Sequence, residues 1–283
     1  MHIAISGRLG SGKSTVCGIL NKDHGLEIYS TGKIQRAIAE RMGITTLELN
    51  RRMALDPKLD HEIDDTVNEI SRRRTGECLV FDSRMAWHFA ENAYKVYMYV
   101  DPTVAAKRVT ADDRGSVEKY KSVEDARDQL KARSEEENRR YKDIYGVDNF
   151  DYSNYDLIVD STSATQYEIA GLIMASFKEN ARGIFLSPKC LFPTALPEDD
   201  CSDELRVFAH GGYNFVSAGH KLLPEYGKRN ANFVKAALET DEAVIAKALA
   251  GAKRRGKKLL KTYTSLSGIE YESIPEAYIR RTK

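Results

Sequence analysis

The stretch Gly7-Arg8-Leu9-Gly10-Ser11-Gly12-Lys13-Ser14-Thr15 decides the fold of this chain, because it fits the pattern G-x-x-x-x-G-K-S/T of a phosphate-binding loop. It follows an apolar run at residues 2–6 and precedes an amphipathic helical segment at residues 15–20. Glycines in such a loop let the backbone turn tightly and aim its N–H groups at phosphate oxygens. The stretch therefore predicts a nucleotide-binding site between a strand and a helix.

Each polar residue of this loop has an expected partner on a nucleoside triphosphate. Lys13 can reach the β and γ phosphates, and the Ser14 hydroxyl can bind Mg²⁺. The helix that begins here adds the positive end of its dipole. The expected cofactors are therefore ATP and Mg²⁺, and the loop residues expected to bind them are Gly7, Gly10, Ser11, Gly12, Lys13, Ser14 and Thr15.

Composition limits the class of protein. The chain has 283 residues, of which 42% are hydrophobic and 30% charged, as in soluble globular proteins of about two domains. No apolar run approaches the roughly 18 residues of a membrane helix, and no signal peptide precedes the loop, so we expect a cytoplasmic protein without a membrane partner. The four cysteines lack C-x-x-C spacing, which argues against a zinc site or a disulfide framework.

Charge divides the chain into two parts. Residues 1–180, here called the first half, carry 26 basic and 30 acidic side chains, whereas residues 181–283, the second half, carry 17 and 12. This asymmetry predicts a domain boundary near residue 181 and permits an anionic partner for the second half.

Alternating patterns in the first half predict an α/β fold. The predicted strands cover residues 26–29, 78–81, 94–100 and 155–159. The predicted helices cover residues 33–41, a segment starting near 46, and residues 60–73, 103–110, 123–145 and 164–178. This order predicts a parallel sheet with helices on both faces. Ligands bind at the carboxyl ends of such strands, where the phosphate loop, Asp82 and Arg84 would meet.

The sequence pattern of the second half predicts a smaller α+β domain. Apolar stretches at residues 206–209 and 213–216 flank His210-Gly211-Gly212, which is a hairpin signal. Helices are expected over residues 231–238 and 241–254.

Arginines indicate which phosphate chemistry the first half performs. Arg133, Glu137 and Arg140 are spaced i, i+4, i+7 and so share one face of a long predicted helix. Arg36 and Arg84 lie near the ends of two predicted strands. Phosphoryl transfer depends mainly on positioning two phosphates and neutralising the charge that spreads over the moving group. This set of cations favours a kinase over other nucleotide-binding proteins.

These motifs, in this order, resemble the cytidylate kinases of the nucleoside monophosphate kinase family, particularly the compact archaeal type. The matching segments are residues 7–15, 29–36, 81–84, 133–141, 145–148 and 155–160. The resemblance implies a sheet of order 2-3-1-4-5, a helical insertion at about 31–73 that binds the monophosphate, and a short lid at about 109–122. It also implies transfer of the γ-phosphoryl group of ATP to CMP or dCMP with Mg²⁺.

The resemblance also implies a role for individual residues. The catalytic residues would be Lys13, Arg108, Arg133, Glu137 and Arg140, of which Arg133, Glu137 and Arg140 would bridge donor and acceptor. Asp82 would hold Mg²⁺ through water beside Ser14. The acceptor would bind to Ser30, Thr31, Arg36 and Arg84, and the lid would contribute Arg108 and Arg114 to the donor. The chain departs from the family on the acceptor side, at Lys33, Gln35, Ser83, Trp87 and His88. These departures leave a modified nucleotide, a non-nucleotide alcohol and lost catalysis open as alternatives.

The second half weakly resembles the ParB/sulfiredoxin-like fold, through residues 186–194 and 212–221. That resemblance implies that Gly219, His220 and Lys221 bind nucleotide phosphates. A structural histidine beside a turn glycine is the alternative. The basic run at residues 253–258 would contact nucleic acid, or it forms a solvated helix end. Two hypotheses follow: a kinase with an accessory domain, or a nucleotide-responsive DNA-binding protein.

Overall fold

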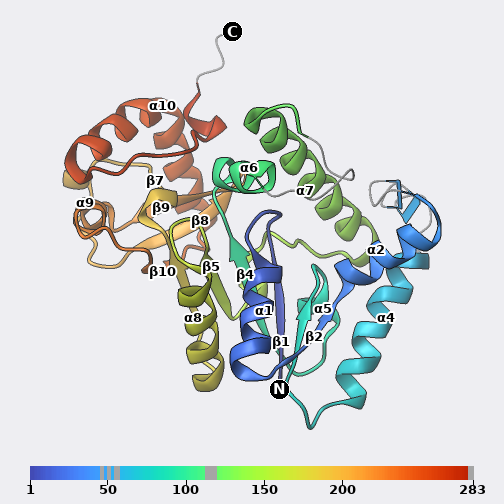
Figure 1. Ribbon diagram of the computed structural model, residues 1–283. Coiled ribbons are helices and arrows are strands. Elements are labelled where there is room, and N and C mark those ends of the chain that lie inside the picture. Colours follow the sequence, from blue (N-terminus) through green and yellow to red (C-terminus); the bar gives the residue numbers. More distant parts are fainter. Residues whose placement is uncertain (45–47, 50–51, 54–57, 112–119, 280–283) are drawn as a thin grey trace.

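The first half forms the predicted parallel sheet. The computed structural model describes residues 1–44, 48–49, 52–53, 58–111 and 120–279 (Figure 1). All pairings among the first five strands are parallel, and their order is the predicted one, β2-β3-β1-β4-β5. The strands are β1 (His2–Gly7), β2 (Glu27–Ser30), β3 (Leu79–Asp82), β4 (Ala93–Tyr99) and β5 (Leu157–Asp160).

Helices connect these strands as the sequence predicts. They are α1 (Lys13–His24), α2 (Thr31–Arg41), α4 (Lys58–Arg73), α5 (Ala86–Phe89), α6 (Pro102–Ala111), α7 (Val123–Tyr145) and α8 (Gln166–Glu179). Only the short helix α5 has no counterpart among the predicted elements. The predicted helix near residue 46 starts outside the described residues, and so does most of the predicted lid, at residues 112–119. Among the described helices, none is both long and apolar enough to cross a bilayer.

Alternating side chains give the sheet two covered faces. On one face, Ile3 and Ile5 of β1 pack with Val16 of α1 and Ile173 of α8. On the other face, Ala4 packs with Phe81 of β3 and Trp87 of α5. Because successive strand residues point to opposite faces, this apolar pattern places α1 and α8 on one side and α5 on the other.

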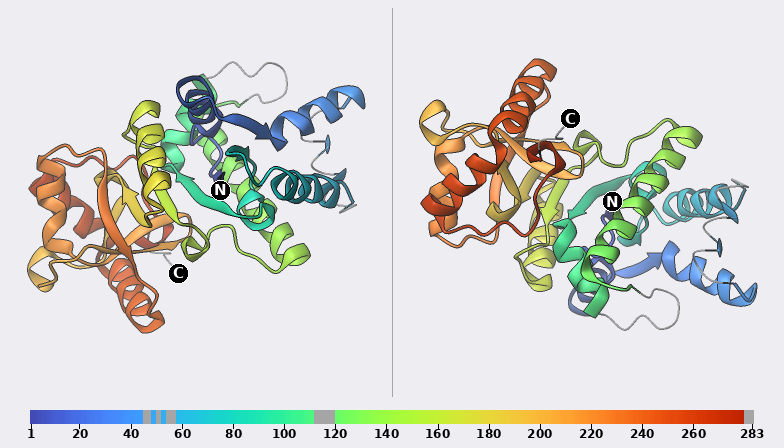
Figure 2. Two further views of the ribbon diagram at one scale, coloured as in Figure 1. Left: turned by 90° about the horizontal axis from the view of Figure 1, so that it is seen from below. Right: turned by 90° about the horizontal axis from the view of Figure 1, so that it is seen from above.

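The second half continues the same sheet. β6 (Gly183–Leu186) pairs in parallel with β5, and β10 (Val234–Leu238) pairs with β6 in the antiparallel sense. β8 (Arg206–His210), β9 (Tyr213–Ala218) and β7 (Leu191–Pro193) follow, so the full order is β2-β3-β1-β4-β5-β6-β10-β8-β9-β7. Figure 2 shows the second half, in orange and red, at one end of the molecule and α2 and α4 at the other. The predicted hairpin is confirmed, since β8 and β9 are antiparallel on either side of Gly211 and Gly212.

Two predicted helices of the second half need correction. The prediction of a helix over residues 231–238 is wrong, because residues 234–238 form β10. Val234 and Ala236 are buried while Lys235 is exposed, and pairing with β6 and β8 overrides the helical preference of the alanines. The helix predicted to end at residue 254 is α10 (Glu242–Ser267), which runs thirteen residues further. The other helix of this half is α9 (Leu223–Lys228).

The two halves share a hydrophobic core. One buried cluster includes Phe81 and Tyr97 of the first half together with Leu186, Val207 and Leu259 of the second. A separate aromatic cluster, with Phe192, Phe208, Phe215 and Tyr278, lies within the second half. The second half is therefore packed against the sheet rather than tethered by a linker.

Candidate active site

Close packing explains the glycines of the phosphate loop. A Cβ atom at Gly7 would lie 2.2 Å from the carbonyl oxygen of Met98, which is backbone on β4. Gly12 precedes α1 in the left-handed conformation, with φ at +81°. Only glycine adopts such geometry without strain, so the loop can bring its backbone close to a bound anion.

Lys13 is held inside the curve of this loop. Its Nζ donates hydrogen bonds to the carbonyl oxygens of Gly7 and Arg8, both at 3.0 Å. Burial lowers the pKa of the Lys13 ammonium to about 8, and the charge of Arg84 acts in the same direction, whereas Asp82 opposes it. An anion that reaches the loop would therefore find this lysine charged at neutral pH.

Asp82 joins the loop to the start of α2. Its Oδ2 accepts a hydrogen bond from the Ser14 hydroxyl at 3.3 Å and another from the Ser30 hydroxyl at 3.2 Å. A hydroxyl and a carboxylate this close are the oxygen ligands that Mg²⁺ prefers, with water and phosphate completing its shell. The described residues contain no cluster of three or more histidine, cysteine or acidic ligands. Ser14 and Asp82 would offer two oxygen ligands to such an ion.

Glu137 of α7 organises the arginines on the opposite side. It is 8% exposed, and its two carboxylate oxygens form ion pairs with Arg84 and with Arg133, the latter at 3.1 Å. Burial and the neighbouring charge of Arg133 lower the pKa of Arg84 to about 10. Several cations therefore crowd around one carboxylate, which is an arrangement that a further anion would stabilise.

A cavity separates the phosphate loop from α7. Its lining includes Gly7 and Arg8 of the loop, Arg84, and Glu137 of α7. Arg140, one turn after Glu137, is partly buried and lies over the ring of Tyr141. Lys13, Arg84, Arg133 and Glu137 therefore gather around one region at the carboxyl ends of β1 and β3.

The remaining predicted residues of the first half divide into three groups. Thr31 is buried at the first position of α2, directly after Ser30. Arg108 donates hydrogen bonds to the carbonyl oxygen of Ser161 at 2.7 Å and to its hydroxyl at 3.2 Å, so it is bound to the loop after β5. Arg114 and the side chain of Arg36 lie outside the described residues.

Sequence reasoning missed Arg8 and Asn149 at this cavity, and it named Trp87 only as a departure from the family pattern on the acceptor side. Trp87 is buried and donates from its indole nitrogen to Asn149 Oδ1 at 2.6 Å, and Asn149 lines the cavity. Arg8, a variable position of the loop pattern, also lines it. No spacing rule finds these residues, because tertiary contacts alone bring them to the site.

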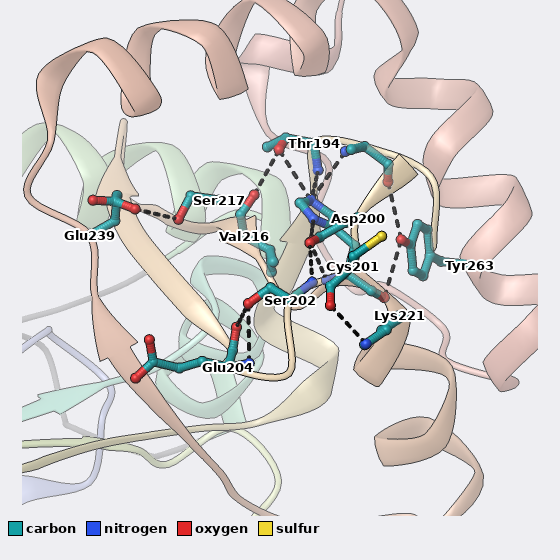
Figure 3. A network of polar contacts seen from close by, with 12 residues as sticks. Thr194, Asp200, Cys201, Ser202, Glu204, Val216, Ser217, Lys221, Glu239 and Tyr263 are labelled. Carbon is teal, nitrogen blue, oxygen red and sulfur yellow. Dashed lines mark hydrogen bonds and ion pairs between the residues drawn. The ribbon is translucent and has the colours of Figure 1, made fainter. Parts of the chain in front are cut away.

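His220 has a structural role in the second half. The residue is 1% exposed, its Nδ1 donates to Asp200 at 2.6 Å, and its Nε2 accepts from the backbone N–H groups of Thr194 and Ala195, both at 3.1 Å. Burial lowers the pKa of this imidazole, which favours the neutral ring that these contacts require. Figure 3 shows Thr194 and Asp200 on either side of this network. The ring therefore ties three segments of the second half together.

The neighbours of His220 also serve the second half. Gly219 has φ at +83°, and a Cβ there would lie 2.6 Å from the carbonyl oxygen of Glu204. Lys221 forms an ion pair with Asp203 at 2.7 Å. The basic run at residues 253–258 lies on α10, where Lys253, Lys257 and Lys258 are exposed. The likeness to the ParB/sulfiredoxin-like fold stays a prediction.

The fold and the site define a kinase-like protein with a phosphate loop. The serine of this loop contacts Asp82, and the lysine lies near the two arginines that pair with Glu137. The chain belongs to the cytidylate kinase-like family, whose sequence model matches residues 2–163.

Individual relatives match different shares of the chain. A cytidylate kinase from Thermoplasma volcanium is 30% identical over 195 residues, covering 68% of this chain and 98% of that protein. An S-adenosylmethionine-dependent nucleotide dehydratase from Lacinutrix mariniflava is 32% identical over 250 residues, covering 78% of this chain. The chain spans about half the length of that dehydratase, at 51%. A shikimate kinase structure from Bacteroides thetaiotaomicron is 15% identical with a TM-score of 0.44, covering 63% of this chain and 98% of that one.

Proposed function

We propose that this protein is an ATP-dependent kinase that transfers the γ-phosphoryl group to CMP, dCMP or a related modified nucleotide. The observation that carries the proposal is the closeness of Lys13 in the phosphate loop to the Arg84–Glu137–Arg133 cluster, since the charges of both arginines act on the lysine. A loop that binds donor phosphates and a cation cluster opposite it suit a reaction between two anions.

The residues would act by positioning and charge neutralisation. Lys13 would bind the β and γ phosphates, while Arg84 would hold the acceptor phosphate against the cluster. Arg133 and Arg140 would neutralise the charge that develops on the moving group, and Glu137 keeps Arg84 and Arg133 in place before the substrates arrive. Mg²⁺ at Ser14 and Asp82 would supply further charge neutralisation. No general base is needed, because the attacking phosphate oxygen is already ionised near neutral pH.

The relatives support a nucleotide as acceptor. The family is named for cytidylate kinases, and the dehydratase relative is named for a reaction on nucleotides. Its match covers more of the chain than residues 1–180, so that protein also shares part of the second half. We propose that residues 1–180 are the catalytic domain and that residues 181–283 are an accessory domain of the same enzyme.

An acceptor screen tests the proposal. Purified protein with ATP and Mg²⁺ is offered CMP, dCMP, the other monophosphates, modified cytidylates and free serine, and products are identified by mass spectrometry. We expect a diphosphate from CMP or dCMP. Lys13→Ala should abolish turnover, while Lys22→Ala, which removes an exposed lysine from the same helix, should not change it. No product from any acceptor would refute the proposed function.

A further inference from the structure

Arg8 extends from the phosphate loop to the second half. Its guanidinium carbon lies 4.6 Å from the centre of the Tyr99 ring, at the end of β4. The Tyr99 hydroxyl donates a hydrogen bond to the carbonyl oxygen of Gly212 at 3.4 Å. The loop, β4 and the turn between β8 and β9 therefore meet at one arginine.

Gly212 of the turn lies against this guanidinium. A Cβ atom added at Gly212 would lie 2.8 Å from Nη2 of Arg8, whereas a Cβ at the neighbouring Gly211 would meet no atom within 4 Å. Both glycines have positive φ, at +84° and +56°. Both positions thus have a backbone that favours glycine, but only Gly212 lies against Arg8.

The backbone of Arg8 is a centre of hydrogen bonding within the loop. Its carbonyl oxygen accepts from Lys13 Nζ at 3.0 Å, from the Ser11 hydroxyl at 2.8 Å and from the Ser11 N–H at 3.3 Å. Its own N–H donates to the carbonyl oxygen of Met98 at 3.0 Å. A shift of Arg8 would therefore change the partners of the lysine that is expected to bind phosphate.

A segment after α10 fixes the second half in this position. The Ser273 hydroxyl donates to Asp101 Oδ1 at 2.7 Å, directly after β4. Glu272 forms an ion pair with Lys107 of α6 at 2.7 Å, and Glu276 forms one with Lys131 of α7. The second half is thus attached to both helices next to the turn that touches Arg8.

We propose that Arg8 is a positioning residue through which the β8–β9 turn of the second half sets the shape of the phosphate loop. The turn holds the guanidinium against Tyr99, and this contact fixes the Arg8 carbonyl that Lys13 and Ser11 share. The inference rests on the proposed function only in requiring that the loop bind a nucleoside triphosphate. It gives the second half a role in nucleotide affinity without any contact to the nucleotide.

The matched glycines provide the test. Gly212→Ala and Gly211→Ala both place an alanine at a positive φ in the turn, but only the first brings a Cβ atom within 3 Å of Arg8. We expect Gly212→Ala to raise the Kd for a non-hydrolysable ATP analogue with Mg²⁺ by about fivefold or more, the lower range of couplings between distinct sites. Gly211→Ala should change it by less than about twofold, which corresponds to roughly 0.4 kcal/mol. Isothermal titration calorimetry measures both constants, and thermal unfolding confirms that both variants are folded.

A double-mutant cycle shows whether the effect passes through Arg8. Arg8→Met keeps an unbranched stem but removes the guanidinium, and it should weaken binding about as much as Gly212→Ala. Adding Gly212→Ala to Arg8→Met should have no further effect. Equal Kd values for the two glycine variants, or additive effects in the cycle, would overturn the inference alone. Absence of binding by the wild type would overturn the proposed function and this inference with it.

Discussion

Glu137→Gln removes the carboxylate that Arg84 and Arg133 share while keeping the shape of the side chain. Breaking a buried ion pair by removing one partner costs about 3–5 kcal/mol. The two arginine side chains here are 23% and 31% exposed, so water screens part of the loss. We therefore expect the free energy of unfolding to fall by about 2 kcal/mol and the melting temperature by about 5 °C.

The same change should act differently on binding and on turnover. Removing a negative charge next to the cavity strengthens the attraction of the arginines for phosphates, so the KM for ATP should stay equal or fall. The arginines lose the group that orients them, so kcat should fall by about tenfold or more. Saturating ATP should also restore more stability to the variant than to the wild type, because the phosphates replace the missing charge.

Urea unfolding with and without ATP, together with steady-state kinetics, measures these effects. Glu136→Gln is the control, since it removes an exposed carboxylate from the neighbouring position of α7. An unchanged unfolding free energy for Glu137→Gln, or a raised KM with unchanged kcat, would refute the view that this carboxylate organises the arginines.

Three further outcomes are expected. The pKa of Lys13 is about 8, so the lysine loses its charge as pH rises through that value. The Kd for ATP should therefore increase above pH 8. A flat Kd between pH 7 and 9.5 in calorimetric titrations would contradict this. Gly7→Ala forces a Cβ into the Met98 carbonyl and should cost about 3 kcal/mol or more in urea unfolding, whereas Gly18→Ala, in open space on α1, should be neutral or stabilising. His220→Ala should lower stability by about 2 kcal/mol but leave the Kd for ATP unchanged, and a large loss of affinity would indicate a ligand rather than a structural histidine.

The sequence predicts most of the first half because its signals are local. The phosphate loop fixes β1 and α1, and the spacing of Arg133 and Glu137 on one helical face is confirmed by their ion pair. The parallel order of the sheet follows from alternating strands and helices. These features depend on neighbours three or four residues apart, or on a motif with its own backbone geometry.

The remaining features depend on contacts between distant segments. Residues 234–238 contain alanines typical of a helix, yet they form a strand because β6 and β8 lie on either side. The indole of Trp87 reaches Asn149 across 62 positions of the chain, and no periodicity encodes that contact. The environment of His220 is equally hard to predict from the sequence. Its ring nitrogens form hydrogen bonds with segments that precede it by about 20 residues or more.

The shared ten-stranded sheet changes the meaning of the compositional boundary near residue 181. A chain cut there would lose β6, so the N–H and C=O groups along the outer side of β5 would have no strand beside them. Leu186, Val207 and Leu259 would no longer cover the apolar face that includes Tyr97 and Ile158. Bare strand edges beside exposed apolar surface promote association between copies. We therefore expect the second half to protect the first half against aggregation, a role that would be independent of catalysis.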